Sequence, residues 1–187
     1  ASVASAMRKT FTLANDTDTY VLGRQFNDVS TAAWVNLNVR HIHYFSYRNR
    51  LPKPLLNGGD HDAGWGCMIR TGQMMLCEAL RRALPNDSVK SVANMFFDTP
   101  DAPFGLHKMT EVGAQNHIKV GQWFNPTCLG YTLKKLVHQC PETTNFLSVV
   151  MARDGMVRQE EITESFILGK HALVVIPVML GIDKISA

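Results

Sequence analysis

The feature that most constrains this chain is a glycine-rich loop, residues 62–66, that delivers a cysteine to the start of an amphipathic segment. Two glycines flank Trp65, so the backbone can turn tightly there. From Cys67 onward, small and apolar residues recur at helical spacing: Met68, Gly72, Met75, Leu76, Ala79, Leu80 and Ala83. The pattern predicts a helix that begins at Cys67 and ends near Leu84, because Pro85 disfavours helix in the residue before it.

The position of Cys67 favours a reactive thiol. The first turn of a helix has unpaired N–H groups and the positive end of the helix dipole, and both favour an anion. The thiolate is the reactive form of cysteine, and helix N-termini lower the thiol pKa. The sequence therefore indicates a catalytic cysteine. A buried structural cysteine at a helix start is the alternative, because free cysteine is among the most buried residue types.

Composition excludes several classes of protein. The chain has 187 residues, 45% of them hydrophobic, which is enough for one globular domain with a core. Its net charge of +3 comes from scattered Lys and Arg, so we expect no nucleic-acid partner. The most apolar run, 172–182, is too short to span a bilayer and contains Pro177. The four cysteines form no CxxC pair, so we expect no disulfide framework and no metal site, and a cytoplasmic location.

Periodicity and turn residues give a mixed set of elements. Asn125 and Pro126 are a strong helix start, since Asn caps and Pro needs no N–H at the first position. We expect strands at 19–22, 42–47, 146–152 and 173–180, and helices at 29–38, 67–84, 106–112, 126–137 and 158–166, with a helical start in 88–97. This order predicts an α+β fold rather than a regular parallel sheet.

Several sequence blocks resemble one protein family. The run Asp62-Ala63-Gly64-Trp65-Gly66-Cys67-Met68-Ile69-Arg70, with Gln73 after it, closely resembles the nucleophile loop of the autophagins. These are papain-like cysteine proteases of autophagy that act on the ubiquitin-like modifier of autophagosome membranes. Further blocks match the family in the same order at 21–24, 45–48, 106–109, 120–127, 133–136 and 173–181. The resemblance runs from Val21 to the C-terminus.

The resemblance implies roles for five residues. Cys67 takes the place of the nucleophile, and Tyr47 that of a tyrosine that helps the nucleophile's backbone N–H form the oxyanion hole. Trp123 matches a tryptophan that lines the groove for the modifier's C-terminal tail. Trp65 is either a wall of that groove or a core anchor. We expect Gln73 to be structural support. On sequence alone, a strand aromatic packed in the core is the preferred interpretation of Tyr47, and core burial of Trp123 is compatible with its place in the groove.

The implied function is a thiol protease without metal or organic cofactor. It would cleave the modifier precursor after its C-terminal glycine and release the modifier from phosphatidylethanolamine, through a thioester on Cys67. Its partners would be both forms of the modifier, and it would reach the autophagosome membrane through the lipidated substrate.

The chain departs from the family in one respect. The family completes its site with a downstream Asp-Pro-His motif, and this sequence contains none. None of its seven histidines can be placed beside Cys67 from sequence alone. We therefore expect residues 1–187 to form a single domain, the N-terminal part of a papain-like protease whose fold is incomplete. The chain is then a fragment, one of two chains that share the site, or a degenerate homologue. The alternative function is a pseudoprotease that binds the modifier without cutting it.

Overall fold

The computed structural model describes residues 19–21, 24–26, 42–85 and 92–178. The chain divides into two compact units, residues 1–42 and 43–187. In the first, strand β1 (Thr19–Val21) pairs antiparallel with β2 (Arg24–Phe26), so that Thr19 lies opposite Phe26. The predicted strand at 19–22 is thus confirmed over its described residues. The predicted helix at 29–38 lies outside the described residues.

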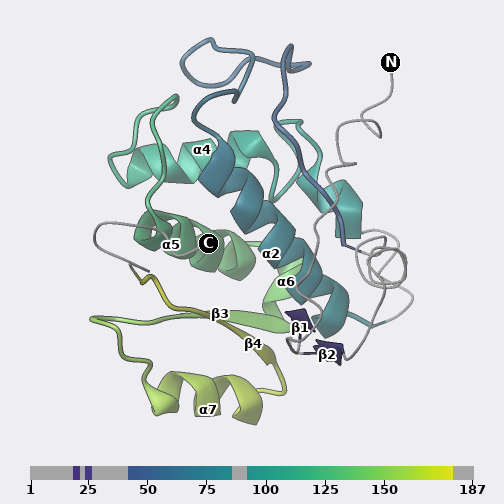
Figure 1. The fold of residues 1–187 in the computed structure, drawn as a ribbon, viewed down its shortest axis with the longest axis vertical. Helices are drawn as coiled ribbons and strands as arrows, with labels where there is room; N and C mark the ends of the chain where they lie inside the picture. Colours follow the sequence, from purple (N-terminus) through teal and green to yellow (C-terminus); the bar gives the residue numbers. More distant parts are fainter. Residues whose placement is uncertain (1–18, 22–23, 27–41, 86–91, 179–187) are drawn as a thin grey trace. The chain divides into compact units, whose positions relative to one another are not determined.

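Helix α2 (Cys67–Ala83) runs through the second unit (Figure 1). It begins and ends where the sequence predicts, and Leu84 after it is extended, as the following proline requires. Ile69, Leu76 and Leu80 on its apolar face are completely buried. This helix therefore supplies much of the hydrophobic core and fixes Cys67 at one end of it.

Two further helices pack near α2. These are α4 (Leu106–Gln115) and α5 (Pro126–Gln139), and the short α6 (Pro141–Thr144) follows α5. The side chain of Asn125 accepts the N–H of Cys128 at 2.7 Å, which confirms the predicted cap. Gly72 of α2 lies so close to Leu129 of α5 that a Cβ at position 72 would overlap the leucine side chain.

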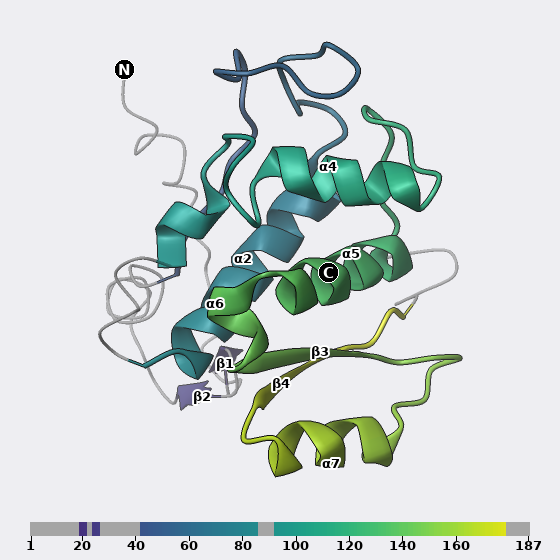
Figure 2. The same cartoon turned by 180° about the vertical axis from the view of Figure 1, so that it is seen from behind.

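The second unit contains a small parallel sheet. Strands β3 (Leu147–Met151) and β4 (His171–Val175) pair in register, Leu147 beside His171, and α7 (Gln159–Ile167) connects them. Helices α5 and α7 lie on opposite sides of the strands (Figure 2). Mixed helices with one parallel strand pair are thus the observed architecture. The predicted strand at 146–152 and the predicted helix at 158–166 are confirmed.

Four predicted elements differ from the structure. The predicted strand at 42–47 is wrong, because these residues are extended but pair with no strand among the described residues. Phe45 instead stacks on Phe96, with ring centroids 5.2 Å apart. The last strand, predicted at 173–180, begins at His171 and ends at Val175, two residues before Pro177. Helix α4 is longer than predicted, and within 88–97 the described helix is the 3₁₀ turn η4 (Ala93–Phe96).

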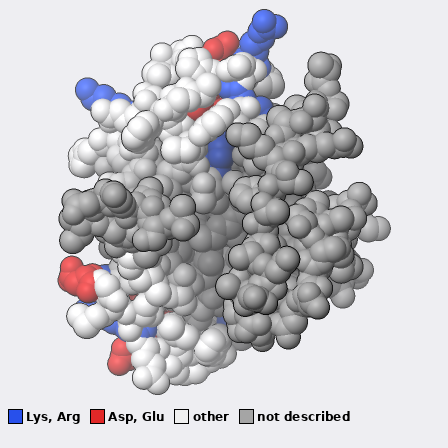
Figure 3. Space-filling view, viewed as in Figure 1, with Lys and Arg blue, Asp and Glu red and all other residues white. Residues whose placement is uncertain are grey.

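No helix among the described residues combines the length and apolar character needed to cross a bilayer. The charged side chains on the face shown in Figure 3 stand singly or in small groups among the described residues.

Candidate active site

Among the cysteines of the described residues, Cys67 is exposed, and it is the first residue of α2. Cys77, Cys128 and Cys140 are buried. Burial raises the pKa of Cys77 to about 12, and it also raises the pKa of Cys128 and of Cys140. These three thiols are therefore poor sources of thiolate, and the alternative of a buried structural cysteine at position 67 does not hold.

The turn before Cys67 is built around the main chain of Asp62. The N–H groups of Trp65 and Gly66 both donate to the Asp62 carbonyl oxygen, at 3.3 and 2.8 Å. Gly64 has φ of +87°, a conformation in which other residues are strained. Gly66 needs glycine for a different reason, because a Cβ there would overlap the Asp62 carboxylate. The two glycines thus set the path of the chain into α2.

Tyr47 lies beside Cys67, although twenty positions separate them in the sequence. Partial loss of water raises the pKa of the Tyr47 phenol, and the charge of Cys67 and a side-chain hydrogen bond with it raise that pKa further. Asp62 and Tyr44 add smaller electrostatic contributions in the same direction. The Tyr47 side chain is 50% exposed, so it is not the buried core aromatic that the sequence alone allowed.

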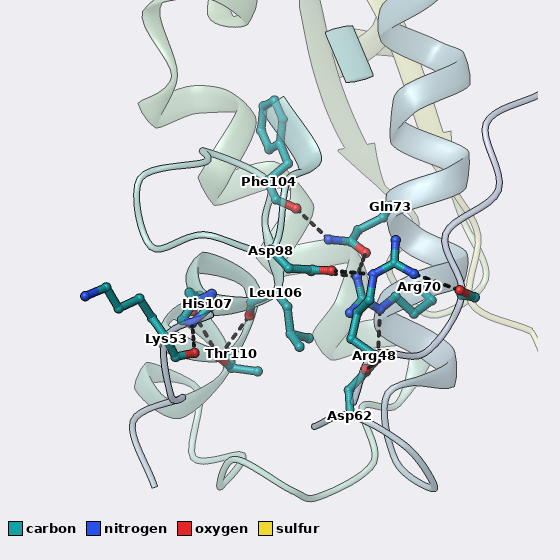
Figure 4. Close-up of polar contacts among 11 residues, drawn as sticks. Arg48, Lys53, Asp62, Arg70, Gln73, Asp98, Phe104, Leu106, His107 and Thr110 are labelled. Atoms are coloured by element: carbon teal, nitrogen blue, oxygen red, sulfur yellow. Dashed lines mark hydrogen bonds and ion pairs between the residues drawn. The ribbon is translucent and has the colours of Figure 1, made fainter. Parts of the chain in front are cut away.

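Asp62 joins the Tyr47 segment to the turn that precedes Cys67, residues 62–66. Its Oδ1 accepts the backbone N–H of Arg48 at 2.6 Å, and its own N–H donates to the Arg48 carbonyl oxygen at 3.2 Å. Its Oδ2 accepts the Nε–H of Arg70, from the first turn of α2, at 2.7 Å (Figure 4). The Asp62 side chain has no exposed surface. One buried carboxylate therefore holds three parts of the chain together.

Arg70 extends this contact into a network of charges. Its guanidinium also donates to Asp98 at 2.8 Å and to Gln73 at 3.0 Å. Burial opposes the charge of Arg70, but hydrogen bonds to Asp62 and Asp98 outweigh it and hold the pKa above its usual value. Asp98 also accepts Nε–H of Arg48 at 3.1 Å (Figure 4).

Sequence reasoning missed the roles of Asp62, Arg70 and Asp98. The signal was an acidic and a basic residue on either side of Cys67, but nothing in the sequence shows that they pair or that Asp98 joins them. The support role expected of Gln73 is confirmed, since its Nε2 donates to the Phe104 carbonyl oxygen at 2.8 Å.

The two tryptophans lie in different surroundings. Trp123, just before α5, is 73% exposed, and its indole N–H donates to the Gly64 carbonyl oxygen at 2.7 Å. Trp65 is 8% exposed and belongs to the hydrophobic core cluster. The structure therefore brings Cys67, Tyr47 and Trp123 around the Gly64–Gly66 turn, whereas the burial of Trp65 supports the core-anchor alternative.

The described histidines lie apart from Cys67 in the hydrogen-bond network. Among the described residues, no hydrogen bond or ion pair joins a histidine ring to Cys67. The ring of His107 instead contacts the Lys53 carbonyl oxygen at 2.9 Å (Figure 4). No three Cys, His, Asp or Glu side chains of the described part come together as metal ligands would.

Comparisons with known proteins give one consistent result. The family model described as Peptidase C54 catalytic domain matches residues 34–187. Cysteine protease ATG4B of Gallus gallus is 31% identical over 155 residues, which cover 76% of this chain and 39% of that protein. Probable cysteine protease atg4 of Schizosaccharomyces pombe is 38% identical over 128 residues, 67% of this chain and 38% of that protein. The chain thus spans less than half the length of these relatives.

Proposed function

Since the chain belongs to the peptidase C54 family of autophagy-related ATG4 cysteine proteases, we propose that it carries the nucleophile and oxyanion-binding part of such a protease. The substrate is the ubiquitin-like autophagy modifier, cut after its C-terminal glycine in the precursor and in the phosphatidylethanolamine conjugate. The fold of the complete protein is papain-like. The observation that carries the proposal is the exposed Cys67 thiol at the start of α2 with the Tyr47 phenol against it.

The proposed chemistry is acyl transfer through a thioester. The Cys67 Sγ attacks the carbonyl carbon of the glycine, and the carbonyl electron pair moves onto oxygen. Collapse of this intermediate breaks the bond from carbon to the leaving amine, which takes up a proton. Water then hydrolyses the thioester and restores the thiol. Among the described residues, no hydrogen-bond partner of Cys67 is a base that could accept the thiol proton.

Tyr47 is suited to stabilise the oxyanion. Its raised pKa keeps the phenol protonated, so that it remains a donor at neutral pH. Together with the backbone N–H of Cys67, it would supply two donors from two separate segments. Fixed donors aimed at developing negative charge are typically the largest single contribution to catalysis of this kind.

Trp123 is suited to select a narrow tail. Its indole is exposed but tied to Gly64, so a flat apolar surface stands next to the turn that precedes the nucleophile. Such a surface can cover the backbone of a glycine while leaving little room for a larger side chain. This supports a substrate that ends in glycine.

A second candidate is a pseudoprotease that binds the modifier without cutting it. The observation that favours it is the exposed Trp123 indole beside the Gly64 turn, which could hold the modifier tail without any chemistry at Cys67. The Trp123 surface would serve binding in either case.

The test is cleavage of the modifier precursor, followed on a gel, by this chain and by the complete product of its natural reading frame. We expect Cys67→Ala to abolish cleavage by the complete protein and to leave modifier binding intact. Cys128→Ala is the matched control, because it removes a buried thiol. Cleavage that survives Cys67→Ala would rule out Cys67 as the nucleophile. Binding without cleavage by the complete protein would establish the pseudoprotease.

A further inference from the structure

We propose that Asp62 is a positioning residue for the oxyanion hole: its buried carboxylate holds the Tyr47 segment in register with the nucleophile turn, so that the phenol meets Cys67. This inference rests on the proposed function. It gives Asp62 a role through Tyr47 rather than in contact with the substrate.

The hydrogen bonds of Asp62 converge on both halves of the site. Oδ1 accepts the N–H of Arg48, the residue directly after Tyr47, at 2.6 Å. The carbonyl oxygen accepts the N–H of Gly66, the residue directly before Cys67, at 2.8 Å. Tyr47 and Cys67 are thus each adjacent in sequence to a residue whose N–H is hydrogen-bonded to Asp62. A displacement of this one residue would change the separation of the two.

The residues around Asp62 hold its carboxylate in one orientation. Its Oδ2 is taken by Arg70 at 2.7 Å, and Gly66 packs directly against it, with no room for a Cβ. The side chain has no exposed surface, so water cannot replace a lost partner. The negative charge is needed as well as the shape, because Arg70 is 4% exposed and requires a counter-charge.

Asparagine at position 62 could accept the Arg48 N–H or the Arg70 Nε–H, but not both. The amide has one acceptor oxygen, and its NH₂ group would face a second donor, either the Arg48 N–H or the Arg70 Nε–H. Asp62→Asn therefore loosens the link between the two segments with almost no change of volume.

Asp98 provides a matched control. Its carboxylate also binds the Arg70 guanidinium, at 2.8 Å, so Asp98→Asn removes one charge from the same network. Asp98 contacts Arg48 only through its half-exposed side chain, at 3.1 Å, and among the described residues it bonds neither the backbone of Arg48 nor that of the turn before Cys67. A general loss of stability should follow either substitution, whereas a loss of alignment should follow only that of Asp62.

The experiment is a double-mutant cycle on the kcat of precursor cleavage by the complete protein. We expect Tyr47→Phe alone to lower kcat by about 100-fold or more, as removal of one oxyanion donor does. In the Asp62→Asn background the same change should lower kcat by less than about three-fold, since the phenol is already misplaced. In the Asp98→Asn background it should again cost about 100-fold. An undiminished Tyr47 effect in Asp62→Asn would overturn the proposal.

A second measurement needs no cleavage. Ultraviolet titration of this 187-residue chain, corrected by its Tyr47→Phe form, follows the Tyr47 phenol directly. We expect Asp62→Asn to lower the phenol pKa and Asp98→Asn to leave it unchanged. Asp62→Glu keeps the charge but moves the carboxylate, so it should lower the pKa too. It also stands in for Asp62→Asn if that variant does not fold. An unchanged pKa in Asp62→Glu would overturn positioning. If Cys67→Ala still cleaves, the proposed function fails, whatever the titration gives.

Discussion

The indole N–H of Trp123 donates a hydrogen bond of 2.7 Å to the carbonyl oxygen of Gly64, a residue 59 positions earlier in the sequence. Trp123 lies two residues before Asn125, the cap of α5, so the bond joins the approach to α5 to the turn that precedes α2. The exposed aromatic ring is therefore held by the same turn that presents Cys67. A change in that turn should therefore move the Trp123 ring and Cys67 together.

Substitution of Trp123 should separate its two contributions. Trp123→Phe keeps a flat ring but loses the bond that fixes it to Gly64, so binding the modifier must then order the ring. That cost is at most about the net 0.5–1.5 kcal/mol of the bond, which predicts an affinity up to about ten-fold weaker. Trp123→Ala also removes the ring and should weaken binding further. Calorimetric titration measures both. Phe166→Ala, an exposed aromatic on α7, is the control and should leave affinity unchanged. Equal affinity of Trp123→Ala and the unmodified chain would contradict the role of the ring.

The Gly64 turn can be tested against a turn with the same backbone conformation. Gly64 and Gly155 both have positive φ, +87° and +74°, and a Cβ would meet no atom within 4 Å at either. Alanine should therefore cost about 1–2 kcal/mol of unfolding free energy at each site. Only Gly64→Ala should slow the alkylation of Cys67 by iodoacetamide. If both variants react at the unmodified rate, Gly64 does not position the thiol.

Loss of Arg70 should be among the most destabilising changes in the chain. Arg70→Met leaves the Asp62 and Asp98 carboxylates without their shared partner, and breaking a buried ion pair costs about 3–5 kcal/mol. Arg82→Met removes a far more exposed pair with Glu78 on the same helix and should cost less than about 0.5 kcal/mol. Urea denaturation measures both. Similar midpoints for the two variants would show that the network is not stabilising.

The buried thiol of Cys77 predicts a loss of stability at high pH. Burial is the main cause that raises its pKa from 9.0 to about 12. Between these values the unfolded chain releases the proton while the folded chain keeps it. The stabilisation is complete below about pH 9 and falls as the pH rises toward 12, by at most about 1.4 kcal/mol per pH unit. Urea unfolding of Cys77→Ala should lack this slope, and identical slopes would contradict the assignment.

The local features of the site followed from the sequence. The glycine-rich loop predicted the start of α2, Pro85 predicted its end, and Asn125 with Pro126 predicted the start of α5. These signals act within a few residues, so they can be read without knowing the rest of the fold. The same holds for the glycines around Trp65, whose turn is made by main-chain bonds within residues 62–66.

The contacts between distant segments could not be read in this way. The segment at 42–47 alternates like a strand, but Phe45 stacks on Phe96 and Asp62 holds the adjacent Arg48 in place of a neighbouring strand. The alternating pattern indicates that one face of the segment is buried, but it does not identify the residues that bury it. Similarly, the sequence allowed Trp123 to be buried in the core, and only the structure shows an exposed ring bonded to Gly64.

The contact between Gly72 and Leu129 sets the spacing of helices α2 and α5, and with it the position of Trp123 relative to Cys67 in the proposed substrate site. Helices α2 and α5 touch there without any side chain on the α2 side. One wall residue, Trp123, stands just before α5, and the nucleophile begins α2. A single methyl at position 72 would press these helices apart and move Trp123 relative to Cys67. If Trp123 and Cys67 act on the substrate as proposed, a buried position outside the site would thus alter substrate selectivity.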